Sequence, residues 1–203
     1  RATPPKASLP ASLHPRWPCR ALRVKLSAMA RVFITRAIPG RAVEQLEAAG
    51  HAVETWPGDL PPPPAELAAA LVRSDAVMAM VVDRITPEML AAAPRLRIVA
   101  NMAAGYDNVD PAAAADLGVW VTNTPGVLAE TTADLAFGLL LAAARRIVES
   151  DRDTRAGGWK TWSPTGFLGA DVFGATLGIV GLGEIGEAVA RRARGFKMRI
   201  LYH

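Results

Sequence analysis

Short apolar runs alternate with alanine-rich stretches along the chain from residue 29 onward. The apolar runs have the length and β-branched content of strands and fall at residues 31–36, 52–56, 76–82, 97–102, 119–122, 176–181 and 198–202. The stretches between them predict helices at 41–49, 64–74, 86–93, 111–117, 128–149 and 184–195. Strand–helix alternation is typical of βαβ units, so the sequence predicts an α/β fold with parallel sheets.

Residues with strong conformational preferences mark several of the predicted helix ends. Thr86 before Pro87, and Asp110 before Pro111, each have the pattern of an N-cap followed by proline in the first helical turn. Gly50 and Gly118 stand where a left-handed residue would end a helix. These signals support the helix positions independently of the apolar pattern.

The predicted helix at 128–149 differs from the others because its centre, residues 135–144, is apolar on almost every side. A helix of this kind is buried on more than one face, so it is expected to bridge two domains or to lie in a subunit interface. Residues 155–170 are rich in Gly, Trp and Pro and predict a loop, after which a second sheet begins near Thr176.

Composition excludes several classes of protein. The chain has 203 residues, of which 51% are hydrophobic and 21% charged, as expected of a globular protein. The single cysteine, Cys19, excludes an intramolecular disulfide and a cysteine zinc cluster, the three histidines are scattered, and no metal site is expected. These features indicate a cytoplasmic protein. The longest apolar stretch is far shorter than the ~20 residues of a membrane span, so no membrane association is expected.

The net charge of +4 comes from the first 28 residues. They hold six basic residues and no acid, and the remainder has 17 basic against 19 acidic residues. No basic face is therefore expected to bind nucleic acid.

Residues 1–28 hold five prolines and show no apolar periodicity, which predicts a disordered or non-native leader. Two origins remain open. Met29 is either the natural start, so that 1–28 is translated upstream sequence, or the segment is an organelle transit peptide.

A glycine-rich turn follows the predicted strand at 176–181. Gly181, Gly183 and Gly186 form the pattern G-x-G-x-x-G between this strand and a helix. The first glycine permits a tight turn, the second lets a diphosphate approach the backbone, and the third lets helix and strand pack closely. Residues 181–186 therefore predict a dinucleotide site, in which the N–H groups at the helix N-terminus face the phosphates.

Two features of this turn bear on the choice between NAD and NADP. Glu184 would repel a phosphate if it faced inward, so it is expected to point to solvent. The residue that contacts the adenosine ribose should lie about 20 residues after the first glycine, a count that reaches Leu201. The residues that choose between NAD and NADP are therefore expected just beyond His203, the last residue. The cofactor is therefore expected to be NADP or NAD, without a choice between them.

A second turn follows the predicted strand at 97–102. Small residues at 103–105 leave backbone N–H groups uncovered at the carboxyl end of a strand, where ligands bind in open α/β sheets. From the residues alone, a carboxylate site and a plain turn remain equally open.

The chain from residue 29 onward resembles the N-terminal half to two-thirds of a D-2-hydroxyacid dehydrogenase, with the glyoxylate/hydroxypyruvate reductases as the nearest branch. The stretches that carry the resemblance are 99–110, 121–128, 132–137, 157–162, 167–169 and 178–186. Glu184 departs from the pattern, since relatives usually carry arginine there, which puts phosphate affinity and NADP preference in doubt.

The resemblance implies a flavodoxin-like substrate lobe at 29–127, followed by the start of a truncated Rossmann NAD(P)-binding lobe at 128–203. It also implies that Ala104 and Gly105 bind the substrate carboxylate and that Leu182 to Ile185 hold the cofactor diphosphate. A homodimer would form through 128–170, with Trp162 reaching into the partner's site. The catalytic Arg, Glu and His would all lie beyond residue 203.

The activity implied is NAD(P)H-dependent reduction of glyoxylate or hydroxypyruvate to the D-2-hydroxy acid, with these 203 residues alone inactive. Two alternatives stay open. One is another dehydrogenase of the family, of the phosphoglycerate or formate type, although residues 81–85 hold only Arg84 for a phosphate. The other is a corepressor-like protein that senses NAD.

Overall fold

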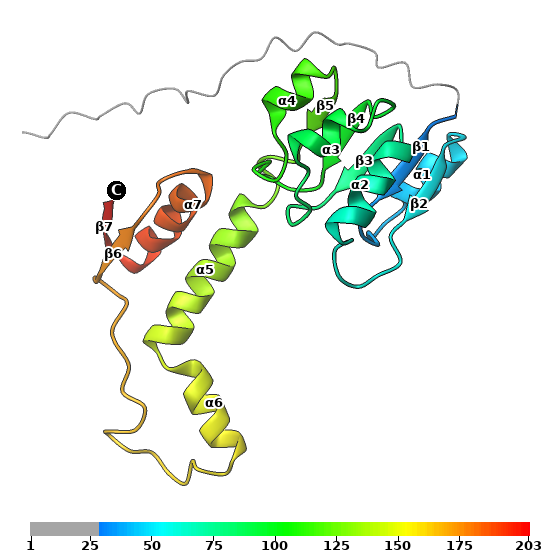
Figure 1. Cartoon of the computed structure of the whole chain (residues 1–203). Helices are drawn as coiled ribbons and strands as arrows, with labels where there is room; N and C mark the ends of the chain where they lie inside the picture. The colour runs from blue at the N-terminus through cyan, green and yellow to red at the C-terminus, as the bar shows by residue number, and fades with distance from the viewer. Residues whose placement is uncertain (1–28) are drawn as a thin grey trace, which may run out of the picture.

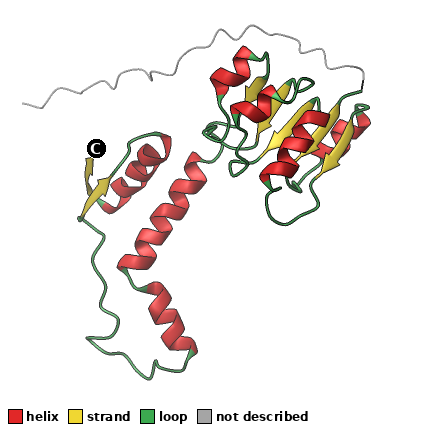
Figure 2. Cartoon of the chain, viewed as in Figure 1, coloured by secondary structure: helices red, strands yellow, loops and turns green. Residues whose placement is uncertain are grey.

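The computed structural model describes residues 29–203, and the leader predicted at 1–28 lies outside the described residues. The first part of the chain folds around a five-stranded sheet in which every pair of neighbours is parallel (Figures 1 and 2). Its strands are β1 (Arg31–Ile34), β2 (Ala52–Thr55), β3 (Ala76–Ala79), β4 (Ile98–Asn101) and β5 (Trp120–Thr122). The order β2-β1-β3-β4-β5 is flavodoxin-like and reverses between β1 and β3. The predicted α/β class and parallel sheet are confirmed.

Helices cover both faces of this sheet because its strands are apolar on both sides. In β1, Val32 and Ile34 pack with residues of α1 (Ala42–Ala48), whereas Phe33 joins the core on the other face. The helices that contribute to that second core are α2 (Pro64–Arg73), α3 (Pro87–Ala91) and α4 (Pro111–Asp116). Alternation along β1 thus directs successive side chains into two separate cores.

The predicted helix ends have the expected chemistry. The Thr86 hydroxyl accepts a hydrogen bond from the N–H of Met89 (3.4 Å), and the Asp110 carboxylate accepts from the N–H groups two and three residues later (2.9 and 3.0 Å). Gly50 and Gly118 have φ of +85° and +70° at the ends of α1 and α4. These caps and stops are confirmed.

The second part of the chain contains a smaller sheet and three helices. Its elements are α5 (Ala129–Ala144), α6 (Ile147–Arg155), β6 (Thr176–Ile179), α7 (Glu184–Ala193), the 3₁₀-helix η1 (Arg194–Phe196) and β7 (Arg199–Tyr202). β6 and β7 are parallel, and α7 connects them. This βαβ unit is the one that the glycine-rich pattern predicts.

The prediction of one helix over 128–149 is wrong, because α5 ends at Ala144 and α6 begins at Ile147. Arg146, between them, has a left-handed backbone (φ +53°). The Ala144 carbonyl instead accepts the N–H of Ala170 (2.8 Å), and a Cβ on Gly169 would lie 2.4 Å from that oxygen. The returning chain therefore occupies the position where α5 would continue. Beyond the break α6 is polar and buries no residue.

Packing of α5 along α7 forms the core of the second part. Ala133 and Phe137 of α5 are buried with Ala188 and Ala193 of α7, and the rings of Phe137 and Phe196 lie 5.1 Å apart. At the edge of this contact Arg191 and Arg192 form ion pairs with α5. Their partners are Glu130, which pairs with both arginines, and Asp134, which pairs with Arg192 (2.6 Å).

The order of these contacts gives the relative direction of the two helices. Residue numbers rise together on both sides, from Glu130 with Arg191 to Phe137 with Phe196. The helices therefore run in the same direction, as Figure 1 also shows. The N-terminus of α7 consequently lies beyond the N-terminal end of α5, toward the five-stranded sheet.

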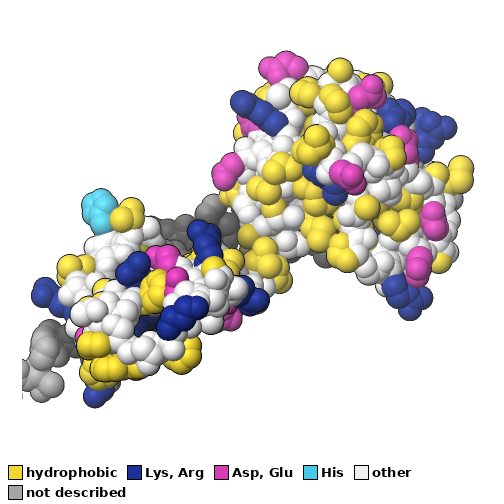
Figure 3. Space-filling model, turned by 90° about the horizontal axis from the view of Figure 1, so that it is seen from below, with side chains coloured by type: hydrophobic (Ala, Val, Ile, Leu, Met, Phe, Trp, Pro, Cys, Tyr) yellow, Lys and Arg dark blue, Asp and Glu magenta, His cyan; other side chains and the backbone are white. Residues whose placement is uncertain are grey.

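The surface carries mixed charge. On the face drawn in Figure 3, the described basic and acidic side chains are interspersed rather than gathered into one basic area. No helix within residues 29–203 is long and apolar enough to cross a membrane.

The ion pairs between α5 and α7 predict a pH-dependent stability. The hydrogen bond from Arg192, supported by Arg191, holds the pKa of Glu130 below its usual 4.5. A carboxylate with a lowered folded-state pKa stabilises the fold fully above its unfolded pKa and loses that effect as the pH falls through the folded value. Glu130→Gln should therefore lower the thermal unfolding midpoint well above pH 4.5, and the difference from wild type should vanish in stronger acid.

The matched control is Glu44→Gln, which removes only an ion pair to Arg41 between two exposed side chains three residues apart. A difference between wild type and Glu130→Gln that stays constant with pH would contradict the prediction.

Candidate functional site

The glycines of the turn between β6 and α7 each meet a different local requirement. Gly181 has φ of +88°, which side chains rarely adopt. A Cβ on Gly186 would lie 2.3 Å from the Gly181 carbonyl oxygen, so only glycine lets the helix pack this close. A Cβ on Gly183 would meet nothing within 4 Å, which leaves open space over the turn. The geometry has the three features that the pattern predicts for a diphosphate-binding turn.

Unpartnered backbone N–H groups line this turn. Those of Leu182, Gly183, Glu184, Ile185 and Gly186 donate no hydrogen bond within residues 29–203. They stand at the N-terminus of α7, where the aligned peptide dipoles add partial positive charge. The arrangement is suited to an anion such as a diphosphate.

The end of β7 lies beside the same turn. The Gly181 N–H donates to the His203 carbonyl (2.9 Å), and Leu201 precedes it in β7 with about half its surface exposed. The Glu184 side chain is exposed, in agreement with the expectation that it points to solvent. The end of β7, after which the residues that select the cofactor are expected, is therefore adjacent to the turn. Neither Leu201 nor His203 supplies an acid for a ribose hydroxyl or a basic pair for a phosphate.

A second set of unpartnered N–H groups lies in the loop that follows β4. The N–H groups of Ala104 and Gly105 donate to no acceptor within the described chain, and both residues are exposed. The Met102 N–H, by contrast, donates to the carbonyl of Ala79 at the end of β3 (2.8 Å). The loop thus lies at the carboxyl edge of the sheet, close to the strand-order reversal where α/β proteins bind ligands.

A buried polar cluster underlies this loop at the point where the strand order reverses. Asp83 is 2% exposed, and one of its carboxylate oxygens accepts hydrogen bonds from the Thr35 hydroxyl and the Met80 N–H (2.7 Å). Its other oxygen is buried with no hydrogen-bond partner among the described residues. No sequence pattern predicted this cluster. The available signal was a polar residue directly after the apolar strand at 31–34 and another in the loop after β3.

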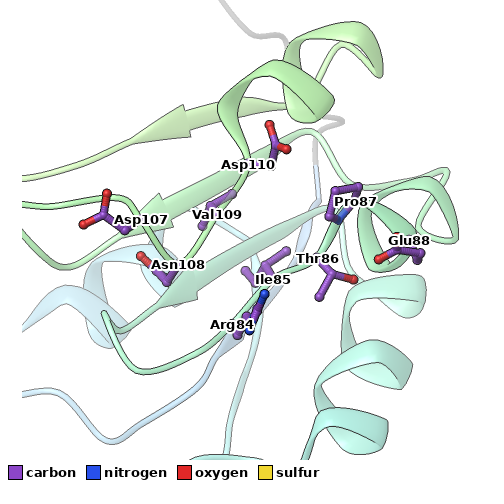
Figure 4. Close-up of a pocket in the computed structure, with 9 residues that line it drawn as sticks. All are labelled: Arg84, Ile85, Thr86, Pro87, Glu88, Asp107, Asn108, Val109 and Asp110. Carbon is purple, nitrogen blue, oxygen red and sulfur yellow. The ribbon is translucent and has the colours of Figure 1, made fainter.

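A cavity of about 420 Å³ lies beside the loop, between residues 84–88 and 107–110 (Figure 4). The two segments are joined by a hydrogen bond from the Ile85 N–H to the Asn108 carbonyl (2.8 Å). The cavity walls carry the carboxylates of Glu88, Asp107 and Asp110 and the single guanidinium of Arg84. This balance of charge disfavours a small anionic substrate, and Ala104 and Gly105 do not line the cavity.

The two amide-lined segments both lie toward the junction between the first and second parts of the chain. The glycine-rich turn precedes α7 at the end that lies toward the five-stranded sheet (Figure 1). The chain enters α5 at this end from β5, and the Asn123 side chain, directly after β5, donates to the Ala104 carbonyl (2.7 Å). A ligand with a diphosphate and a second ligand with a carboxylate therefore have anchoring groups on the same side of the molecule.

Trp162 lies apart from this region. It is 77% exposed in the loop between α6 and β6. Figure 1 shows that loop at the far end of α5 from the five-stranded sheet. Within one copy of the chain, Trp162 is therefore not brought to Ala104 and Gly105.

Comparison with known families decides the relationship of this chain to other proteins. The family model "D-isomer specific 2-hydroxyacid dehydrogenase, catalytic domain" matches residues 32–195. The chain belongs to the D-2-hydroxyacid dehydrogenase family. The resemblance stated from the sequence motifs is confirmed at this level.

Individual relatives support the same branch. The chain is 54% identical over 177 residues to a glyoxylate reductase of Thermococcus kodakarensis and 53% identical over 174 residues to one of Korarchaeum cryptofilum. These alignments cover 85% of this chain but 53% and 52% of the two relatives, so the chain spans about half their length. The crystal structure of the TT0316 protein from Thermus thermophilus is similar with a TM-score of 0.80 and 47% identity, over 85% of this chain and 55% of that one.

The glycine-rich turn predicts opposite outcomes for two alanine substitutions. Gly186→Ala should lower the free energy of unfolding of the β6–α7 unit by about 1–3 kcal/mol, because the new methyl group would overlap the Gly181 carbonyl oxygen. Gly183→Ala should leave stability almost unchanged, because its methyl group meets open space and its φ is −84°. Thermal unfolding followed by circular dichroism measures both, and equal stability of the two variants would contradict this account of the turn.

Proposed function

We propose that this chain is part of an enzyme that reduces a small 2-oxo acid, glyoxylate or hydroxypyruvate, to the D-2-hydroxy acid with NAD(P)H. The observation that carries the proposal is the pair of amide-lined segments on the same side of the molecule, one suited to a diphosphate and one to a carboxylate. The glyoxylate reductases that are 53% and 54% identical to this chain, over about half of their own length, support the substrate.

The roles of the residues follow from their chemistry. The N–H groups of residues 182–186 bind the cofactor diphosphate, while Gly181 and Gly186 maintain the turn. The N–H groups of Ala104 and Gly105 bind the substrate carboxylate and so orient its carbonyl carbon. When bound, the nicotinamide would supply the hydride that the carbonyl carbon of the substrate receives. By resemblance, the Arg, Glu and His that polarise the carbonyl and supply the proton lie beyond residue 203.

The substrate is expected to be small and without a phosphate. Val81 and Val82 follow β3 at the carboxyl edge of the sheet, and their side chains are 57% and 60% exposed. Apolar side chains at this edge provide no charge for a phosphoryl group, and Arg84 is the single basic residue of 81–85. This disfavours a phosphoglycerate substrate.

The assembly that we propose is a homodimer formed through 128–170. Several large apolar side chains of this segment are exposed, among them Leu135 and Leu139 on α5 and Trp159 and Trp162 on the loop, each at least 60% exposed. Burial of such a patch by a second copy is the ordinary way to remove it from water. In this dimer Trp162 reaches the partner's substrate site.

The proposed division of the chain is a substrate domain at 29–127 and the start of the NAD(P)-binding domain at 128–203. The separation of the five-stranded sheet from the β6–β7 pair supports it. The single cysteine of the sequence supports a cytoplasmic location.

The proposed cofactor role predicts dinucleotide binding by the 203-residue chain. Titration with NADH or NADPH, followed by nicotinamide fluorescence, should show saturable binding, and Gly183→Ala should weaken it at least about tenfold, since its methyl group stands where the diphosphate approaches. Glyoxylate-dependent oxidation of the bound cofactor should be negligible, because the proposal places the proton donor beyond residue 203.

Failure of both dinucleotides to bind would overturn the cofactor assignment. Turnover at the rate of a complete dehydrogenase would overturn only the placement of the catalytic groups beyond residue 203.

The proposed dimer predicts a mass of two chains in sedimentation equilibrium. Leu139→Arg should shift the equilibrium to monomer, because it places a charge within the exposed face of α5. Leu60→Arg is the matched control, since Leu60 is 77% exposed but lies outside 128–170. A monomeric wild-type chain, or equal dissociation by the two variants, would exclude this interface.

A further inference from the structure

The carbonyl oxygens of three consecutive loop residues each accept a hydrogen bond from the framework of the protein. Ala103 accepts from the N–H of Thr124 (2.8 Å), Ala104 from the Asn123 side chain (2.7 Å) and Gly105 from the Asn101 side chain (2.8 Å). The donors come from the ends of β4 and β5, which flank the loop on the sheet. Each carbonyl of the segment is therefore held toward the protein.

Planarity of the peptide unit converts these contacts into a direction for the N–H groups. In a trans peptide the N–H of a residue points opposite to the carbonyl of the residue before it. Holding the carbonyls of Ala103, Ala104 and Gly105 therefore aims the N–H groups of Ala104, Gly105 and Tyr106 away from the framework. None of these three groups donates a hydrogen bond within residues 29–203.

The side chains that hold the loop are themselves fixed. Asn101 is 2% exposed, and its amide forms a reciprocal pair with that of Asn108 (3.0 and 3.1 Å). The Asn108 amide nitrogen also lies within hydrogen-bond distance of the carbonyls of Met80 and Asp83 (3.1 and 3.0 Å), so its two protons are shared among three acceptors. These contacts connect it to the buried Asp83 cluster. The framework thus links the carboxyl ends of β1, β3, β4 and β5.

All three asparagines of the chain belong to this framework. An amide side chain offers two donors and one acceptor at a fixed separation, so it can hold one carbonyl while it is anchored to a second group. Asn101 uses both donors in this way. Aspartate at the same position would place a carboxylate against a carbonyl oxygen and could donate to neither.

We propose that Asn123 and Asn101 are positioning residues that aim the N–H groups of residues 104–106 at the substrate carboxylate, with Asn108 holding Asn101 in place. The inference rests on the proposed function, since it assigns the carboxylate as the anion. Neither asparagine contacts the substrate in this account. Each acts through a loop carbonyl, and the two direct different peptide units.

Asn123→Ala tests the proposal because Asn123 is less buried than Asn101 and, among residues 29–203, its side chain makes a single hydrogen bond, to the Ala104 carbonyl. The probe is glycolate, and the readout is the movement of the Ala104, Gly105 and Tyr106 amide resonances of the 203-residue chain. Loss of one hydrogen bond that orients the site should weaken glycolate binding about three- to tenfold. Thr122→Ala is the matched control, because the neighbouring Thr122 side chain is exposed and forms no hydrogen bond with the described part of the chain. This variant should bind glycolate as wild type does.

A purely structural role for Asn123 would leave the affinity of the folded variant for glycolate equal to that of wild type, and that result would overturn the proposal. Failure of the wild-type chain to bind glycolate would overturn the carboxylate role of the loop itself, which separates the two failures. Should the variant not fold, the scalar coupling across the hydrogen bond from Asn123 to the Ala104 carbonyl is measured in wild type. The proposal requires that coupling to be present with glycolate bound, and its absence would overturn it.

Discussion

Hydrogen bonds to consecutive loop carbonyls determine where the backbone N–H groups of residues 104–106 point. Much of the first part of the chain, around the five-stranded sheet, holds the donors of these hydrogen bonds in place. The flavodoxin-like strand order brings the ends of β1, β3, β4 and β5 to one edge of the sheet. Polar side chains at these ends then connect to one another rather than to water. The core helices on both faces hold the strands, and the strands hold the framework that orients the loop.

The glycine-rich turn reaches a similar result by different means. There the N–H groups lack partners because they stand at a helix N-terminus, where no preceding turn supplies carbonyls. The loop after β4 has no helix to do this, since α4 starts only at Pro111, and it depends on side-chain amides instead. Two anion-binding geometries in one chain thus arise from two different ways of leaving a backbone donor unpaired.

Patterns local in sequence predicted the elements of this fold well. Alternation of apolar and alanine-rich runs located all seven strands within three residues at each end, and the caps at Thr86 and Asp110 have the predicted hydrogen bonds. The break between α5 and α6 was not predictable from periodicity, because it depends on Ala170 returning to the Ala144 carbonyl from a distant part of the chain. The asparagine framework was not predictable from local patterns for the same reason, since Asn101 and Asn123 reach the same loop only because β4 and β5 are neighbours in the sheet.

The contact between Ala170 and Ala144 also closes the segment between them at its base. The two ends of this segment, residues 145–169, which we call the arm, are fixed to each other, so its interior transmits little strain to α5 or to β6. Insertions or deletions among residues 156–168 are therefore absorbed by the arm itself, and the cost of closing a longer loop grows only slowly with its length. Within one copy of the chain, the length of the arm can therefore change while α5 and β6 keep their positions.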